Sequence, residues 1–346
     1  MNNLIDACSI KTIYDLLMDD ISRKIFENRF MYSLTDDSQY IRNVVSTIDV
    51  GQKIVNRIVS TKKEIGIFGA GAIGKYIINT YKDLGKIKCF IDNKVEGEVY
   101  NGIPVISLND FKKMYPDGMV VISTKIFYEE ILEQLKNNDF LEEDIINLGK
   151  EYELLNHKQY FDLPELKYTN GEEEVFVDGG AFDGSSTVEF MNWCKKGNKK
   201  GFSYVWEPDK ANQEKCKDML DKKIDYEIIE KGLWNQFGEI SFSMDGSTSS
   251  AVSETGTEKI IVDSIDGICN KPISFIKMDV EGSEYNALLG SKNVIEKYKP
   301  KLAICIYHKK EDIWEIPLLI HKINPEYRFY MRHYSLADNE TVLYAI

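Results

Sequence analysis

Two acidic residues end neighbouring strands of the predicted fold, and a glycine-rich turn lies between them. Asp178 follows the apolar run 175–177, which is typical of a buried strand, and Glu207 follows the next short run, 204–206. A carboxylate at the end of the second strand can accept hydrogen bonds from both hydroxyls of a ribose. Two acids around a glycine turn suit a ligand with a cationic end and a ribose but no phosphate. We therefore predict S-adenosylmethionine as the cofactor.

The turn after Asp178 has the pattern Asp-x-Gly-x-x-x-Gly and leads into a helical segment. Backbone N–H groups and hydroxyls at the start of that helix can bind a carboxylate, which would be the methionine end of the cofactor. The residues that we expect to contact the cofactor are Asp178, Gly179, Gly180, Ala181, Asp183, Gly184, Ser185, Ser186, Glu207 and Asp279.

A second group of polar residues follows two later strands, predicted at 274–278 and 302–306. His308 is the best general base of this group by its ordinary pKa of about 6.5. Asp279 and Glu281 share a face if their strand continues, and they could orient an acceptor hydroxyl or bind a divalent cation. The alternatives are that His308 is an ordinary hydrogen-bonded strand-end residue, that Glu281 holds the turn and that Asp279 caps the next helix. We predict His308, Asp279 and Glu281 as the catalytic residues.

Strands and helices alternate from residue 174 onward, and the chain ends in a hairpin formed by 327–334 and 341–346. This order predicts an α/β fold in which a parallel, Rossmann-like sheet is closed by one antiparallel terminal strand. Breakers at Pro164 and Asn170-Gly171 mark a linker over residues 150–173.

The first part of the chain has its own glycine motif. Gly69, Gly71 and Gly74 follow a predicted strand at 64–68, and Asp92 lies at the end of the next strand. This is the context of a dinucleotide-binding fingerprint, so a nucleotide or sugar-nucleotide site is one interpretation. The other is a scaffold domain that keeps the glycines for close helix–strand packing. Apolar residues recur at helical spacing over residues 1–60, which could cap a neighbouring domain or form a homodimer. The predicted domains are therefore 1–60, 61–150 and 151–346.

Composition limits the classes of partner and compartment. The 346-residue chain has a net charge of −13, which disfavours binding to a nucleic-acid backbone. Its six cysteines form no Cys-x-x-Cys pair, so neither a structural zinc site nor a disulfide framework is expected, and no metal-binding set is assigned. The sequence shows no signal peptide and no apolar run long enough to span a membrane, which favours a cytoplasmic location.

Four stretches resemble the FkbM-type methyltransferase family: 175–187, Trp206-Glu207-Pro208, 262–266 and, most distinctively, 276–284 with its Lys-x-Asp-Val-Glu-Gly motif. The resemblance covers roughly residues 160–346 and implies a class I methyltransferase fold with S-adenosylmethionine as methyl donor. Characterised members of the family methylate hydroxyl groups of sugars or polyketides. Residues 64–149 are similar to small Rossmann-like domains of bacterial glycan pathways. We therefore expect an O-methyltransferase acting on a sugar, a glycan or a related small molecule.

Two other functions fit parts of the sequence. One is a nicotinamide-dependent sugar-modifying enzyme that uses the N-terminal glycine motif. None of the tyrosines, however, has a lysine four residues later, as the Tyr-x-x-x-Lys pattern of short-chain dehydrogenases requires. The other is a non-catalytic nucleotide-binding scaffold. Retention of both strand-end acids and of the whole 277–284 motif argues against the scaffold.

Overall fold

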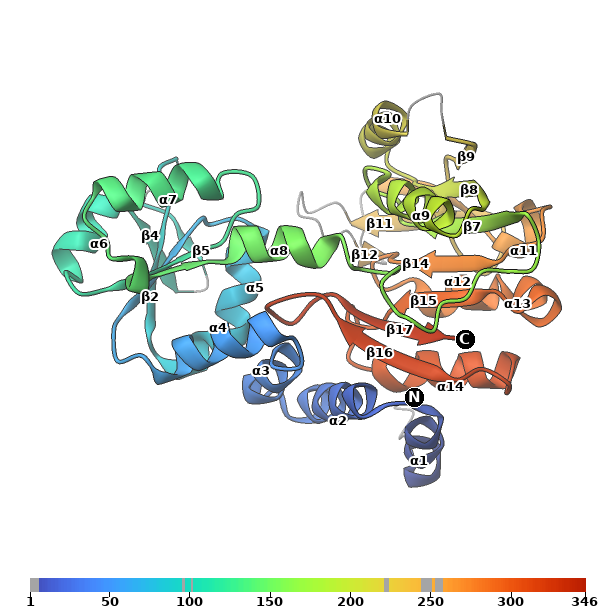
Figure 1. Ribbon diagram of the computed structural model, residues 1–346, viewed down its shortest axis with the longest axis horizontal. Coiled ribbons are helices and arrows are strands. Elements are labelled where there is room, and N and C mark those ends of the chain that lie inside the picture. The colour runs from blue at the N-terminus through green and yellow to red at the C-terminus, as the bar shows by residue number, and fades with distance from the viewer. Residues whose placement is uncertain (1–5, 95–96, 101, 221–223, 244–250, 253–257) are drawn as a thin grey trace. The chain divides into compact units, whose positions relative to one another are not determined.

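The computed structural model describes residues 6–94, 97–100, 102–220, 224–243, 251–252 and 258–346 (Figure 1). The chain divides into two compact units. Unit 1 contains residues 1–26, 159–332 and 340–346, and unit 2 contains residues 27–158 and 333–339. The linker predicted at 150–173 therefore contains one crossing point between the units. The sequence does not indicate the crossings near residues 26, 332 and 340.

Unit 1 is built on a seven-stranded sheet with the strand order β16-β17-β15-β14-β7-β8-β9. β17 runs antiparallel to β15, while β15, β14, β7, β8 and β9 pair in parallel. This confirms the predicted α/β fold with an antiparallel terminal strand. The strands are β7 (Glu173–Gly179), β8 (Lys200–Trp206), β9 (Tyr226–Ile229), β14 (Phe275–Met278), β15 (Lys301–Cys305), β16 (Phe329–His333) and β17 (Thr341–Ala345).

The central strands of this sheet are mostly apolar and buried, as expected where helices cover both faces of a parallel sheet, with Asp178 and Lys277 as buried charged residues. Helix α9 packs on β7 and β8, and α14 contacts α1, α12 and α13. The helices of unit 1 are α1 (Ala7–Leu16), α9 (Ser185–Lys196), α10 (Lys210–Met219), α11 (Ile265–Ile268), α12 (Glu284–Leu289), α13 (Lys292–Tyr298) and α14 (Asp312–Ile323).

A separate four-stranded sheet in unit 1 has the order β10-β13-β11-β12. Its strands are β10 (Gly232–Leu233), β11 (Gly238–Ser243), β12 (Ala251–Val252) and β13 (Glu258–Asp263). β10 pairs in parallel with β13, and β11 pairs antiparallel with both β12 and β13.

Unit 2 is a Rossmann-like domain with the strand order β3-β4-β2-β1-β5-β6, parallel except for the short β3–β4 pair. Its strands are β1 (Ile65–Phe68), β2 (Ile87–Ile91), β3 (Val99–Tyr100), β4 (Ile103–Ile106), β5 (Met119–Ile122) and β6 (Ile145–Asn147). Its helices are α3 (Ser38–Val45), α4 (Asp49–Ser60), α5 (Ala72–Tyr81), α6 (Leu108–Met114), α7 (Tyr128–Asn137) and α8 (Leu148–Asn156), with short 3₁₀ turns η1 (Lys82–Leu84) and η2 (Glu142–Asp144). One apolar core joins α3, α4 and α5 to the sheet.

The N-terminal helices do not form one element. Helix α1 packs on α14 inside unit 1, and Leu17 forms an isolated parallel bridge with Phe329 of β16. Helix α2 (Asp20–Thr35) begins in unit 1 and ends in unit 2. The first helix therefore serves as a packing element of the large sheet. In the described residues, no helix has the length and apolar character needed to cross a membrane.

Candidate active site at the strand ends of unit 1

The glycine turn after β7 packs directly against the end of β14. Gly180 has a φ of +74°, and a Cβ atom there would lie 1.9 Å from the backbone oxygen of Asp279, so only glycine fits. The amides of Gly180 and Ala181 both donate to the carbonyl of Trp206 at 3.1 Å. Gly184, with a φ of +83°, is the N-cap of α9. The turn is therefore held by two neighbouring strands and leaves the start of α9 at the carboxyl edge of the sheet.

Asp178 is fully buried under this turn. Its Oδ2 accepts hydrogen bonds from Ser186 Oγ at 2.6 Å and Thr187 Oγ1 at 2.7 Å, and its Oδ1 lies 3.0 Å from Lys277 Nζ. Lys277 also donates to the carbonyl of Gly180 at 2.7 Å. In this structure the carboxylate and the Ser186 hydroxyl thus support the turn from inside. Their direct contact with a cofactor stays a prediction.

Glu207 lies at the end of β8, also buried, with one amide on each carboxylate oxygen. Phe182 N donates to Oε2 and Asp209 N donates to Oε1, both at 2.9 Å. Burial raises the pKa of Glu207, although these hydrogen bonds act in the opposite direction. A carboxylate oxygen can accept two hydrogen bonds, and the Asn212 side chain is a further donor to Glu207. Contact of Glu207 with a ribose stays a prediction.

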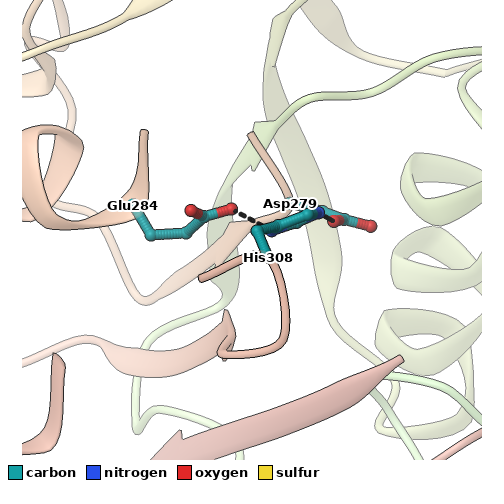
Figure 2. A group of neighbouring side chains, drawn as sticks. All are labelled: Asp279, Glu284 and His308. Atoms are coloured by element: carbon teal, nitrogen blue, oxygen red, sulfur yellow. Dashed lines mark ion pairs between the residues drawn. The ribbon is translucent and has the colours of Figure 1, made fainter. Parts of the chain in front are cut away.

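The second predicted group assembles as expected from the strand order. β14 and β15 are parallel neighbours with Met278 opposite Ile304, so Asp279 and His308 follow adjacent strand ends. His308 Nε2 lies 3.5 Å from Asp279 Oδ1 and 3.5 Å from Glu281 Oε2. His308 Nδ1 lies 2.9 Å from Glu284 Oε1, and Figure 2 shows the imidazole ring between Glu284 and Asp279. We call Asp279, Glu281, Glu284 and His308 the acid–histidine cluster.

The strand does not continue through the cluster. β14 ends at Met278, and Glu281 has a φ of +51°. The condition under which Asp279 and Glu281 would share one strand face is therefore not met, and the turn itself brings both carboxylates to His308. The alternative that Asp279 caps the next helix is wrong, because Ser283 is the N-cap of α12.

Close carboxylates control the protonation of the cluster. Burial lowers the pKa of His308, but Glu284, Asp279 and Glu281 outweigh it and raise that pKa to about 10. Burial, with Asp279 and Glu284 close by, raises the pKa of Glu281 to about 8 against the attraction of His308. Burial also raises the pKa of Asp312 to about 7, with further repulsion from Glu284. The imidazole is thus a cation at neutral pH in the free protein, rather than the neutral base expected from its ordinary pKa.

Three residues of the site escaped the sequence reasoning. Tyr160 OH donates to Asp279 Oδ2 and Tyr307 OH donates to Asp279 Oδ1, both at 3.1 Å. Glu284 is fully buried, and its Oε1 accepts from Val280 N at 2.9 Å. Tyr307 directly precedes His308, and Glu284 is the last residue of the 276–284 motif, so both were close to predicted site residues. Tyr160 lies 119 positions before Asp279, so nothing local in the sequence pointed to it.

Unit 2 has a glycine turn of its own. Gly69 has a φ of +109°, and a Cβ on Gly74 would lie 2.3 Å from the carbonyl oxygen of Gly69, while a Cβ on Gly71 would meet no atom within 4 Å. Asp92 Oδ2 accepts from Ala70 N at 3.2 Å. Gly69 therefore allows the turn, Gly71 leaves the backbone open, and Gly74 allows close packing of the helix on the turn. A nucleotide or sugar-nucleotide ligand stays a prediction.

Residues 178–335 match the family model described as the methyltransferase FkbM domain. This part of the chain belongs to the FkbM methyltransferase family. The protein is accordingly an S-adenosylmethionine-dependent methyltransferase, and its sheet is of the class I methyltransferase type. Residues 60–146 match a second family model, described as the C2185-like N-terminal domain.

A solved methyltransferase structure is similar in fold. The crystal structure of methyltransferase FkbM from Methylobacillus flagellatus KT is 20% identical, with 86% of this chain and 93% of that chain covered and a TM-score of 0.53. Fibrillarin from Aeropyrum pernix, in complex with natively bound S-adenosyl-L-methionine, is 8% identical over 57% of this chain and 76% of that one, with a TM-score of 0.35. No curated protein matches the chain with significant similarity.

Proposed function

We propose that this FkbM-type enzyme transfers the methyl group to a hydroxyl of a sugar, a glycan or a related small molecule. The observation that carries the proposal is the acid–histidine cluster at the ends of β14 and β15, beside the β7 turn that packs on Asp279. Carboxylates accept hydrogen bonds from hydroxyls. The excess of acids over basic groups in the cluster disfavours an acceptor with a phosphate at the reacting position.

For the cofactor, we propose that the turn from Asp178 to Ser186 holds the methionine end and that Glu207 holds the ribose. The place of the Glu207 carboxylate at the end of β8, beside the glycine turn, supports the ribose contact. Asp183 and Ser185 lie at the open end of the turn, where the amide of Ser185 already donates to Asp183 Oδ1 at 3.0 Å. The backbone of Gly180 packs against the backbone of Asp279, so the cofactor turn lies next to the acid–histidine cluster, where the acceptor would bind.

The proposed chemistry is an in-line displacement at the methyl carbon. The new C–O bond forms while the S–C bond breaks with its electron pair left on sulfur, and the hydroxyl proton passes to the cluster. Most of the rate enhancement would come from holding the hydroxyl oxygen in line. The side chains of Glu281 and Asp279 are 31% and 22% exposed, against 10% for His308. The two carboxylates are therefore better placed than the imidazole to meet the acceptor, and His308 holds them in position.

Methyl transfer to matched acceptors tests this proposal. Labelled S-adenosylmethionine would be incubated with a panel of free sugars, glycosides and sugar nucleotides, each paired with the amino sugar that replaces one hydroxyl by an amine. The expected product is a methyl ether on a hydroxylated acceptor. Methylation of the amino sugars alone, or of no member of the panel, would contradict the assignment. Calorimetric titration with S-adenosylmethionine, without any acceptor, separates a failure of acceptor choice from a failure of cofactor binding.

The alternative activities concern unit 2 and stay predictions. A nicotinamide-dependent sugar-modifying activity, or nucleotide binding without catalysis, would use Gly69, Gly71, Gly74 and Asp92. The exposed backbone at Gly71 is the observation that favours a ligand there. Calorimetric titration of the full chain with NAD⁺, NADH and a uridine diphosphate sugar tests both alternatives. Absence of heat with all three would contradict both alternatives and leave the glycines of unit 2 with a packing role alone.

A further inference from the structure

The acid–histidine cluster has the composition of a metal-binding site. Asp279, Glu284 and His308 each offer one possible ligand atom, and these atoms lie within 4.8 Å of one another. They come from the end of β14, the start of α12 and the segment after β15, so the fold rather than one local motif brings them together. Figure 2 shows both carboxylates directed toward the imidazole.

An independent observation sets this group apart from an exposed acidic patch. Glu284 is fully buried, and among the described residues its Oε2 finds no hydrogen-bond partner. The side chain of His308 is only 10% exposed, and its Nδ1 lies 2.9 Å from the other oxygen of Glu284. Burying a polar atom without a partner destabilises a fold. Glu284 Oε2 is therefore available to a ligand that the described residues do not provide.

We propose that Asp279, Glu284 and His308 bind a divalent cation of the manganese type. Two carboxylates and one imidazole, which must release its proton when the ion binds, form a mixed donor set that suits Mn²⁺. Three protein ligands leave coordination positions free for water or a substrate oxygen.

The supporting contacts are those expected around metal ligands. Asp279 receives one tyrosine hydroxyl on each oxygen, from Tyr160 and Tyr307, and Glu284 receives the amide of Val280. Such neighbours fix the orientation of ligating carboxylates. The partly exposed Glu281, 3.5 Å from His308, is placed to hydrogen-bond a molecule bound at a free coordination position.

The role of the cation in methyl transfer rests on the proposed function, whereas its binding does not. A cation at this position would contact the acceptor oxygen and hold it in line with the methyl group. Binding and turnover are therefore measured separately.

Electron paramagnetic resonance of Mn²⁺ tests the binding, because the signal of the free ion decreases when it is bound. The full chain would be titrated with Mn²⁺ in the absence of S-adenosylmethionine and acceptor. We expect one bound ion per chain, and affinity at least tenfold weaker in both Asp279→Asn and His308→Ala. The exposed Glu311→Gln, which removes one charge near α14 but lies outside the cluster, is the matched control and should bind like the wild type.

Two results would overturn the site. One is no bound Mn²⁺ in the wild type at millimolar ion. The other is equal affinity in Asp279→Asn, His308→Ala and the wild type, which would place the ion elsewhere on this acidic chain. Circular dichroism checks that each variant is folded, and two substitutions of different size guard against one that does not fold.

For the role in catalysis, chelation should abolish turnover and Mn²⁺ should restore it. Full turnover after chelation would remove the cation from the reaction, while titration with S-adenosylmethionine reports independently on cofactor binding.

Discussion

In both units a strand leads into a glycine turn and a helix, and an acid at the end of the next strand braces the turn. In unit 1, Phe182 N donates to Glu207 at 2.9 Å, and in unit 2, Ala70 N donates to Asp92 at 3.2 Å. The difference lies in the residue that precedes the first glycine of the turn. It is the buried Asp178 in unit 1 and the buried Phe68 in unit 2.

The choice of Asp178 or Phe68 at this position changes the side chains that support the turn. Asp178 is joined by Lys277 and by two hydroxyls of α9, so the turn of unit 1 rests on an internal ion pair. The turn of unit 2 rests on apolar residues. Both α5 and α9 follow a glycine N-cap without a side-chain cap, so both helix starts favour an anionic group. In unit 1 the carboxylates of Asp178 and Glu207 add a preference for a cationic group, so the side chains can change the ligand preference of the same supersecondary unit.

The largest expected effect concerns the acid–histidine cluster, which has no counterpart in the unit 2 turn. His308→Ala should lower turnover by roughly 10²–10⁴-fold, because the carboxylates that hold the acceptor lose the group that positions them. Steady-state methyl transfer measures this, with cofactor affinity determined separately and expected to stay the same. His157→Ala, an exposed histidine of unit 2, is the matched control. Near-full turnover in His308→Ala would remove the cluster from the chemistry.

The next effect is on stability and tests the internal ion pair directly. Asp178→Ala leaves Lys277 buried without its carboxylate, so the free energy of unfolding should fall by about 3–5 kcal/mol. All four tryptophans lie between residues 193 and 314, so their fluorescence during urea unfolding reports on unit 1. Asp15→Ala, which breaks an exposed pair with Lys11, should leave stability nearly unchanged, because solvent screens the pair. Equal losses in the two variants would show that the buried pair has no special structural role.

Cofactor binding should respond to the acid that braces the unit 1 turn. Glu207→Ala should weaken S-adenosylmethionine binding by about 1.5–3 kcal/mol, the usual contribution of hydrogen bonds to a charged group. Isothermal titration calorimetry measures the change, and Glu214→Ala on the exposed side of α10 serves as control. An unchanged affinity would dismiss the ribose contact and leave Glu207 as a brace for Phe182.

The smallest effect is expected at the corresponding acid of unit 2. Asp92→Ala should leave S-adenosylmethionine affinity within about 0.5 kcal/mol of the wild type, because changes at independent sites add without coupling. The same calorimetric titration is the measurement. A clear loss of cofactor affinity would mean that the two turns do not act independently, and the contrast between them would need another explanation.

Much of the fold was readable from the sequence because local patterns specify it. The apolar runs before Asp178, Asp279 and His308 are strands, and glycines mark turns where the backbone adopts positive φ. The sequence also predicted that Asp279 and His308 end neighbouring strands. The division into units was readable only in part, because α1 joins the large sheet through tertiary packing on α14 that leaves no local signal.

The chemical state of the site was decided by tertiary structure. The sequence identified His308, Asp279 and Glu281 but assigned the histidine its ordinary pKa, because sequence spacing does not show how many carboxylates surround one ring. The turn at Glu281 and the start of α12 bring three carboxylates to His308, and their charge outweighs burial and raises its pKa to about 10. Tyr160 reaches Asp279 from 119 positions away. Residue type and strand order were thus set by the sequence, whereas protonation and hydrogen bonding depend on distances that exist only in the folded chain.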